Sequence, residues 1–102
     1  MTRKFRRLSD GEILRAINDG VICADSIGGL YYHGPLKTNT RRCSESVRLH
    51  LNGGRRDTTV ARLVWMCWNR KVIPPGYVVG HLNDDRTDHS PMNLELMRRK
   101  WK

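Results

Sequence analysis

Residues 47–60 carry the pattern that most restricts the fold of this chain, because apolar and polar side chains alternate there. Val47, Leu49 and Leu51 alternate with Arg48 and His50, and a period of two places the apolar residues on one face of a strand. The turn signal Asn52-Gly53-Gly54 follows, and residues 58–60 can form a returning strand. The pattern predicts a β-hairpin in the middle of the chain.

Helical signals lie on both sides of this hairpin. Ser9 and Glu12 form a capping box, Leu8 can contact Ile13, and Gly20 ends the predicted helix. A second helix is expected over residues 61–70. Short strands are expected at 21–24 and 30–33, a polar loop at 34–44, and a further strand at 77–79. One core is expected from Leu63, Val64, Cys67, Trp68, Val78, Val79, Leu94 and Met97. The predicted class is α+β, with short β-hairpins and two or three helices.

A length of 102 residues suits one domain. We expect a basic N-terminal arm at residues 1–8, a helix and β-hairpin region at 9–58, and a C-terminal unit at 59–102. The last two are expected to form one compact domain.

The chain is strongly basic, with 19 Lys and Arg against 10 Asp and Glu, a net charge of +9. Such an excess favours binding to a polyanion, most simply double-stranded DNA, over a surface that is charged only for solubility. The candidate phosphate contacts are Arg41, Arg42, Arg55, Arg56, Arg98, Arg99 and Lys100.

Other partners and compartments are disfavoured by what the sequence lacks. No run of about 18 apolar residues or secretory leader is recognised, so we expect a cytoplasmic protein with no membrane partner. The three cysteines form no Cys-x-x-Cys pair, which argues against a zinc ribbon or a redox dithiol.

Most of the candidate catalytic and metal-binding side chains lie within residues 77–102. A short β run ends at His81, a polar loop with Asp84, Asp85 and His89 follows, and Ser90-Pro91 is a helix start signal. We therefore predict a strand, a loop and a helix over residues 92–102, with titratable groups at the junction.

This segment resembles the HNH endonucleases of the phage and intron homing type. The matching motifs are Arg62-Leu63-Val64-Trp65, then Pro75-Gly76-Tyr77-Val78-Val79-Gly80-His81-Leu82-Asn83-Asp84-Asp85, and then Pro91-Met92-Asn93-Leu94-Glu95. The resemblance covers residues 59–95 and implies a ββα-metal unit that hydrolyses DNA phosphodiester bonds.

The resemblance also implies roles for individual residues. His81 matches the general base that deprotonates the attacking water, which suits a histidine. Asn93 matches the asparagine that holds the hairpin loop so that the histidine is correctly oriented. A divalent metal ion, expected to be Mg²⁺, would bind the scissile phosphate and stabilise the leaving 3′ oxygen.

Two positions depart from the family pattern. Gly80 stands where many members have a metal-binding Asp or His, and the last motif position falls on Lys102. Asp84, Asp85 or His89 could supply substitute ligands, since hard cations accept carboxylates. Without the motif, the same aspartates are typical turn residues, His89 is expected on the surface, and Trp65, Trp68 and Trp101 are expected to pack in or near the core.

Two functions remain open. The first is an HNH-type endonuclease with His81 as its base. The second is a catalytically deficient HNH-like module that binds nucleic acid or a host or phage protein that handles nucleic acid.

Overall fold

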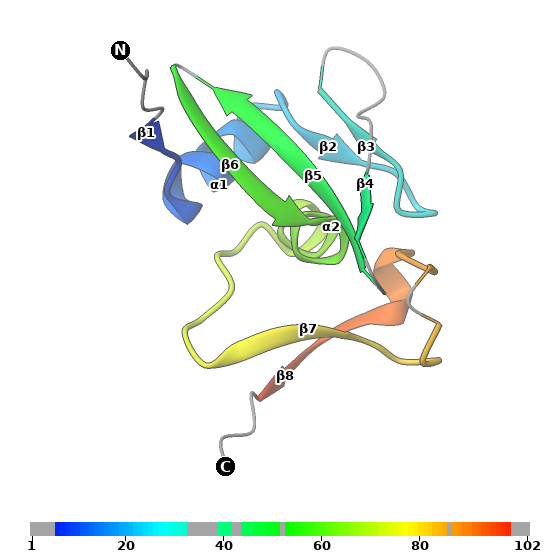
Figure 1. The fold of residues 1–102 in the computed structure, drawn as a ribbon. Coiled ribbons are helices and arrows are strands. Elements are labelled where there is room, and N and C mark those ends of the chain that lie inside the picture. Colours follow the sequence, from blue (N-terminus) through cyan, green and yellow to red (C-terminus); the bar gives the residue numbers. More distant parts are fainter. Residues whose placement is uncertain (1–5, 33–38, 42–43, 52, 86, 99–102) are drawn as a thin grey trace.

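The computed structural model describes residues 6–32, 39–41, 44–51, 53–85 and 87–98, and it has an α+β fold (Figure 1). In chain order the elements are β1 (Arg6–Arg7), α1 (Asp10–Asn18), β2 (Cys23–Ala24), β3 (Leu30–Tyr31), β4 (Asn39–Arg41), β5 (Ser44–Leu51), β6 (Gly54–Thr59), α2 (Val60–Asn69), β7 (Tyr77–His81), the 3₁₀ turn η1 (Pro91–Asn93) and β8 (Leu94–Arg98). The predicted fold class is confirmed. Within these ranges, no helix is long and apolar enough to cross a membrane.

The largest sheet has the strand order β1-β6-β5-β4. Its centre is the predicted hairpin, in which β5 and β6 pair antiparallel from Ser46↔Thr59 to Leu51↔Gly54. Val47 and Leu49 point into the core and are almost fully buried. The predicted loop at 34–44 is wrong in part, because residues 39–41 form β4 and pair with β5.

The capping box predicted at the start of α1 is confirmed. The Ser9 hydroxyl accepts a hydrogen bond from the Glu12 amide, and the Glu12 side chain reaches back to the Ser9 amide. Of the arm predicted at residues 1–8, residues 6–8 belong to the fold: β1 pairs with β6 in parallel, and Leu8 is buried in the core. Residues 1–5 lie outside the described residues. A Cβ on Gly54 would lie 2.6 Å from Leu8 Cδ2, so a larger residue here would have to displace the buried Leu8 side chain.

Helix α2 is the central element of the molecule. It contacts α1, the strands β2, β5 and β6, and the β7–β8 hairpin, and in Figure 1 it lies between the large sheet and that hairpin. Seven of its ten residues are buried, as expected for a helix that is covered on most sides. The Thr59 hydroxyl caps its start by accepting a hydrogen bond from the Arg62 amide.

The predicted core needs three corrections. Leu63, Val64, Cys67 and Leu94 are buried, and Val79 packs against the core, but Trp68, Val78 and Met97 lie largely at the surface. Trp68 is 48% exposed, whereas Trp65, three residues earlier, is only 8% exposed. The Trp68 indole lies beside β2, where its Nε1 donates to the carbonyl of Ala24. A strand of two residues covers only part of so large a side chain.

The helix predicted over residues 92–102 is also wrong within the described residues. Ser90 makes no side-chain cap, Pro91 begins only the short turn η1, and Leu94–Arg98 is the strand β8. This strand pairs antiparallel with β7 from His81↔Leu94 to Tyr77↔Arg98. Pairing with β7 and burial of Leu94 against α2 therefore override the local helix-start signal.

Candidate active site

His81 lies where the β7–β8 hairpin closes. It is the last residue of β7 and is paired with Leu94, the first residue of β8. Just beyond this pair, the Leu82 amide donates to the Asn93 carbonyl at 2.8 Å. The half-buried His81 side chain is therefore fixed to a rigid strand end, with the loop 82–93 folded beside it.

The side chain of Asn93 joins the two ends of this loop. Its Oδ1 accepts from the Asn83 amide at 3.1 Å, while its Nδ2 donates to Asn83 Oδ1 at 2.9 Å and to the Asp88 carbonyl at 3.0 Å. An asparagine amide can accept and donate at once, which is what this arrangement uses. Asn93, at the end of the loop, thus holds the part of the loop that directly follows His81.

The loop aspartates bond mainly to the loop itself. Asp85 Oδ1 accepts from the Thr87 hydroxyl at 2.6 Å and from the Thr87 amide at 3.0 Å, and these bonds lower the pKa of Asp85. Asp88 accepts from the Ser90 amide and from Asn83 Nδ2, and the pKa of Asp88 is lowered chiefly by its hydrogen bonding to Ser90. Both carboxylates are therefore stabilised as turn-forming acceptors.

His89 is buried, so the prediction of a surface histidine is wrong. The residue is only 8% exposed, and both of its ring nitrogens have partners. Nδ1 lies 3.1 Å from His81 Nε2, and Nε2 lies 3.3 Å from Glu45 Oε1. The two imidazole planes are inclined at 55°. Glu45 was missed from the sequence, since it lies on β5, 44 residues before His89, and no motif marks it.

The turn between β2 and β3 packs against the backbone of His89. Gly28 has a φ of +89°, and a Cβ at this position would collide with the His89 carbonyl group. Both the positive φ and the close approach require glycine here. The buried histidine is therefore enclosed by the β2–β3 turn, β5 and the end of β7.

The described residues do not assemble a metal site. Within those ranges no group of three or more His, Cys, Asp and Glu side chains converges on one point. Asp84 is exposed with a φ of 59°, and Asp85 and His89 make the contacts above, so the predicted substitute ligands do not form a set that fits a divalent ion.

The position before His81 is also filled. A Cβ on Gly80 would collide with the side chain of Met97, which lies on the paired strand β8. The second departure from the motif, at Lys102, lies outside the described residues.

The predicted phosphate contacts differ in their surroundings. Arg98 is exposed at the end of β8, and Arg55 is half-buried in β6. The side chain of Arg56 is 12% exposed, forms an ion pair with Asp10 at 2.6 Å and donates to the Leu8 carbonyl, so it supports α1 rather than facing solvent. The Arg41 side chain, Arg42, Arg99 and Lys100 lie outside what the structure describes.

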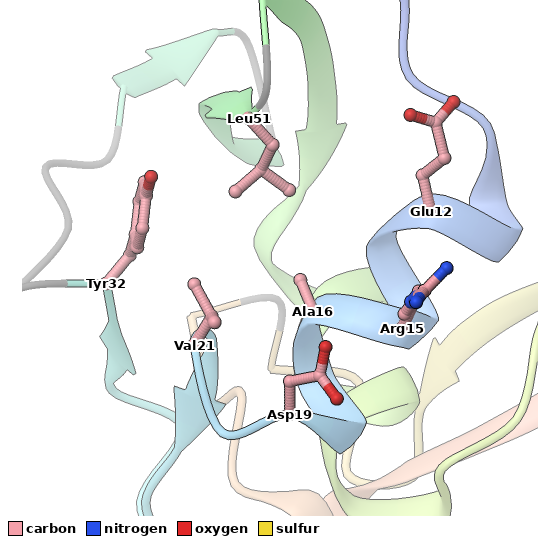
Figure 2. A pocket seen from close by; sticks show the side chains of 7 residues that line it. All are labelled: Glu12, Arg15, Ala16, Asp19, Val21, Tyr32 and Leu51. Carbon is pink, nitrogen blue, oxygen red and sulfur yellow. The ribbon is translucent and has the colours of Figure 1, made fainter.

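A cleft elsewhere on the molecule takes no part in this site. It has a volume of about 310 Å³ and lies beside α1, where Glu12, Arg15 and Asp19 face Val21, Tyr32 and Leu51 (Figure 2). Glu12 is already bound to Arg6 and to the start of α1. None of the residues lining the cleft belongs to the loop at His81.

Two comparisons with known proteins found a match. Residues 59–100 match the family model described as HNH endonuclease. The fold is similar to that in a structure titled "DNA binding and cleavage by the HNH homing endonuclease I-HmuI", with a TM-score of 0.65 and 20% sequence identity. The match covers 78% of this chain and 47% of that one, so the chain spans just under half the length of that endonuclease. A search of curated proteins found no match.

Proposed function

We propose that the protein binds DNA and hydrolyses its phosphodiester bonds, with His81 as the general base, because residues 59–100 match the family model described as HNH endonuclease. The main observation behind the proposal is the loop that follows His81, which Asn93 holds in place with three side-chain hydrogen bonds. A general base must be held within reach of the water that it deprotonates, and a strand end braced in this way supplies that rigidity.

The proposed reaction exchanges one bond to phosphorus and transfers two protons. His81 accepts a proton from water as the water oxygen attacks phosphorus, and the bond from phosphorus to the 3′ oxygen breaks. The leaving 3′ oxygen takes a proton from solvent water, and the products are a 5′-phosphate and a 3′-hydroxyl. Asn93 acts in this scheme by holding the loop, without contact with the substrate.

The metal is the part of the family chemistry that the described residues do not support. HNH endonucleases generally use a divalent metal ion, and Mg²⁺ is the first ion to test. Among the described residues, Asp84, Asp85 and His89 do not converge on one point that such an ion could occupy.

DNA binding is supported by the net charge of +9. Arg98 and Arg55 are the described candidates for phosphate contact, together with Arg41, Arg42, Arg99 and Lys100. Each neutralised phosphate releases counterions, so affinity for duplex DNA is expected to fall steeply as salt is raised. An affinity that does not change with salt would contradict this part of the proposal.

The second function, a catalytically deficient binding module, is favoured by one observation. Gly80 carries no side chain, and Met97 fills the adjacent space. Such a module would keep the fold and the basic surface, and it would bind DNA or a protein that handles nucleic acid.

Nicking of supercoiled plasmid in Mg²⁺, Mn²⁺ or Ni²⁺ separates the two functions. His81→Ala is expected to reduce nicking by a factor of about 10² to 10⁴ and to leave DNA affinity nearly unchanged. His50→Ala is the matched control, since His50 is an exposed histidine on β5 with no assigned role. Salt-dependent DNA binding without nicking would favour the binding module, and absence of both would overturn the endonuclease and the DNA-binding form of the module.

A further inference from the structure

Three side chains from separate parts of the chain form one continuous hydrogen-bonded series. Glu45 on β5 contacts His89 in the loop, and His89 contacts His81 at the end of β7. The middle member is the most buried: the His89 side chain is 9% exposed and that of Glu45 is 27% exposed. Burial restricts the imidazole of His89 to the position in which both contacts are made.

The carboxylate of Glu45 sets the direction of each hydrogen bond in the series. An ionised carboxylate can only accept, so His89 must donate its Nε2 proton to Glu45. A neutral imidazole carries one proton, and Nδ1 of His89 is then an acceptor. Nε2 of His81 must in turn donate to that atom, which places the remaining lone pair of a neutral His81 on Nδ1.

We propose that Glu45 and His89 are positioning residues that hold His81 in the tautomer protonated at Nε2, so that Nδ1 is the nitrogen that accepts the proton from water. The role of this nitrogen rests on the proposed function, whereas the tautomer itself does not. A carboxylate that orients a histidine base through a ring N–H is a general device of base catalysis. Here a second histidine lies between the two.

The surroundings support a role in orientation. Gly28 packs against the His89 backbone, so the ring cannot retreat from His81 without displacing the β2–β3 turn. Asp85 and Asp88 also act electrostatically on His81, but Oδ1 of Asp85 is engaged by Thr87, and both oxygens of Asp88 are engaged by Ser90 and Asn83. Glu45 is therefore the carboxylate that reaches the histidine pair through a ring nitrogen.

The tautomer can be measured without any cleavage. Nitrogen-15 chemical shifts of the His81 ring in the unmodified protein are expected to show a protonated Nε2 and an unprotonated Nδ1 at pH above the titration of both histidines. Glu45→Gln is expected to remove this preference, because an amide can either donate or accept. Glu95→Gln is the matched control, since Glu95 is an exposed glutamate on β8, and it should leave the His81 shifts unchanged.

Two results would overturn the proposal. A His81 ring protonated at Nδ1, or one whose tautomer is the same in Glu45→Gln, would show that the series does not orient the base. The first of these results needs no variant, so it can be obtained even if Glu45→Gln fails to fold.

Cleavage supplies an independent reading if the protein nicks DNA. Glu45→Gln and His89→Gln are each expected to lower kcat at least about tenfold with little change in KM, whereas a loss of DNA contact would raise KM. Equal kcat in these variants and the unmodified protein would overturn the positioning role. Absence of nicking together with the expected tautomer would refute the proposed endonuclease and leave the orientation of His81 established.

Discussion

The closed end of the β7–β8 hairpin and its strands are held in different ways. At the closed end, side chains make the contacts: Asn93 crosses the loop, and His81 meets His89. Along the strands, the backbone makes them, and the apolar side chains of Val78 and Met97 remain partly in solvent. Side-chain hydrogen bonds are therefore concentrated around His81. The space next to the neighbouring residue, Gly80, is filled by the flexible side chain of Met97.

The largest effect on the closed end of the hairpin is expected from a substitution at Gly28, which lies in the β2–β3 turn that packs against the His89 backbone. Gly28→Ala is expected to lower the free energy of unfolding by about 2–4 kcal/mol, because it adds a strained positive φ and a clash with the His89 backbone. Gly53→Ala is the matched control, since Gly53 has a φ of +78° but nothing within 4 Å of its added Cβ. Chemical unfolding of both variants measures the difference. Equal losses would show that the β2–β3 turn does not constrain His89.

Removal of the Asn93 side chain is the next largest change. Asn93→Ala is expected to cost about 1–3 kcal/mol of unfolding free energy, because it leaves polar groups of the loop without their partners. Met92→Ala provides the control at the adjacent position, where the side chain is 87% exposed and its loss should be nearly neutral. A stable Asn93→Ala protein with unchanged His81 chemical shifts would mean that the loop is held by its backbone alone.

A side chain at Gly80 is expected to have a smaller effect on stability than one at Gly28. The three atoms nearest to the added Cβ of Gly80→Asp all belong to the flexible side chain of Met97, so the cost should be about 1–3 kcal/mol at most and should fall in the double variant with Met97→Ala. The same double variant is expected to raise Mn²⁺ affinity in a calorimetric titration, since it places a carboxylate beside His81. Unchanged affinity would show that the hairpin cannot be converted into a metal site at this position.

Acid should weaken the closed end only slightly. Because the pKa values of Asp85 and Asp88 are lowered from 3.8 in the folded protein, their contribution to stability is complete above that value and is lost as the pH falls through the folded-state pKa values. Thermal unfolding between pH 6 and about pH 2.5 should therefore lose less stability to acid in Asp85→Asn or Asp88→Asn than in the control Asp84→Asn. Parallel curves for all three variants would contradict the role of these carboxylates.

Two local signals in the first half of the chain predicted their elements correctly. The Ser9 capping box and the alternation at Val47 to Leu51 each act over a few residues, and both appear where the sequence placed them. The same kind of signal failed at Ser90-Pro91, because pairing with β7 decided the conformation of residues 94–98. Local capping signals do not report on a partner strand that is distant in the sequence.

The candidate site was predictable only where a motif marked it. His81 and Asn93 were selected by their resemblance to the motif of a known family. Glu45 could not be selected, since a single glutamate 44 residues before His89 carries no periodicity and no motif. The burial of His89 was missed for the same reason: it depends on Gly28 and Glu45, which reach it only in the folded chain.

Because Glu45 contacts His89, the segment that carries the motif does not contain all the residues that fix the geometry of the site. The segment 59–100 that matches the family model contains His81, His89 and Asn93, but it lacks the carboxylate and the β2–β3 turn that enclose His89. Transplanted onto another scaffold, it would carry the recognisable residues without the partners that fix their geometry. In this protein, the unit that could be inherited or engineered as a functional whole therefore includes β2, β3 and β5 as well as the motif.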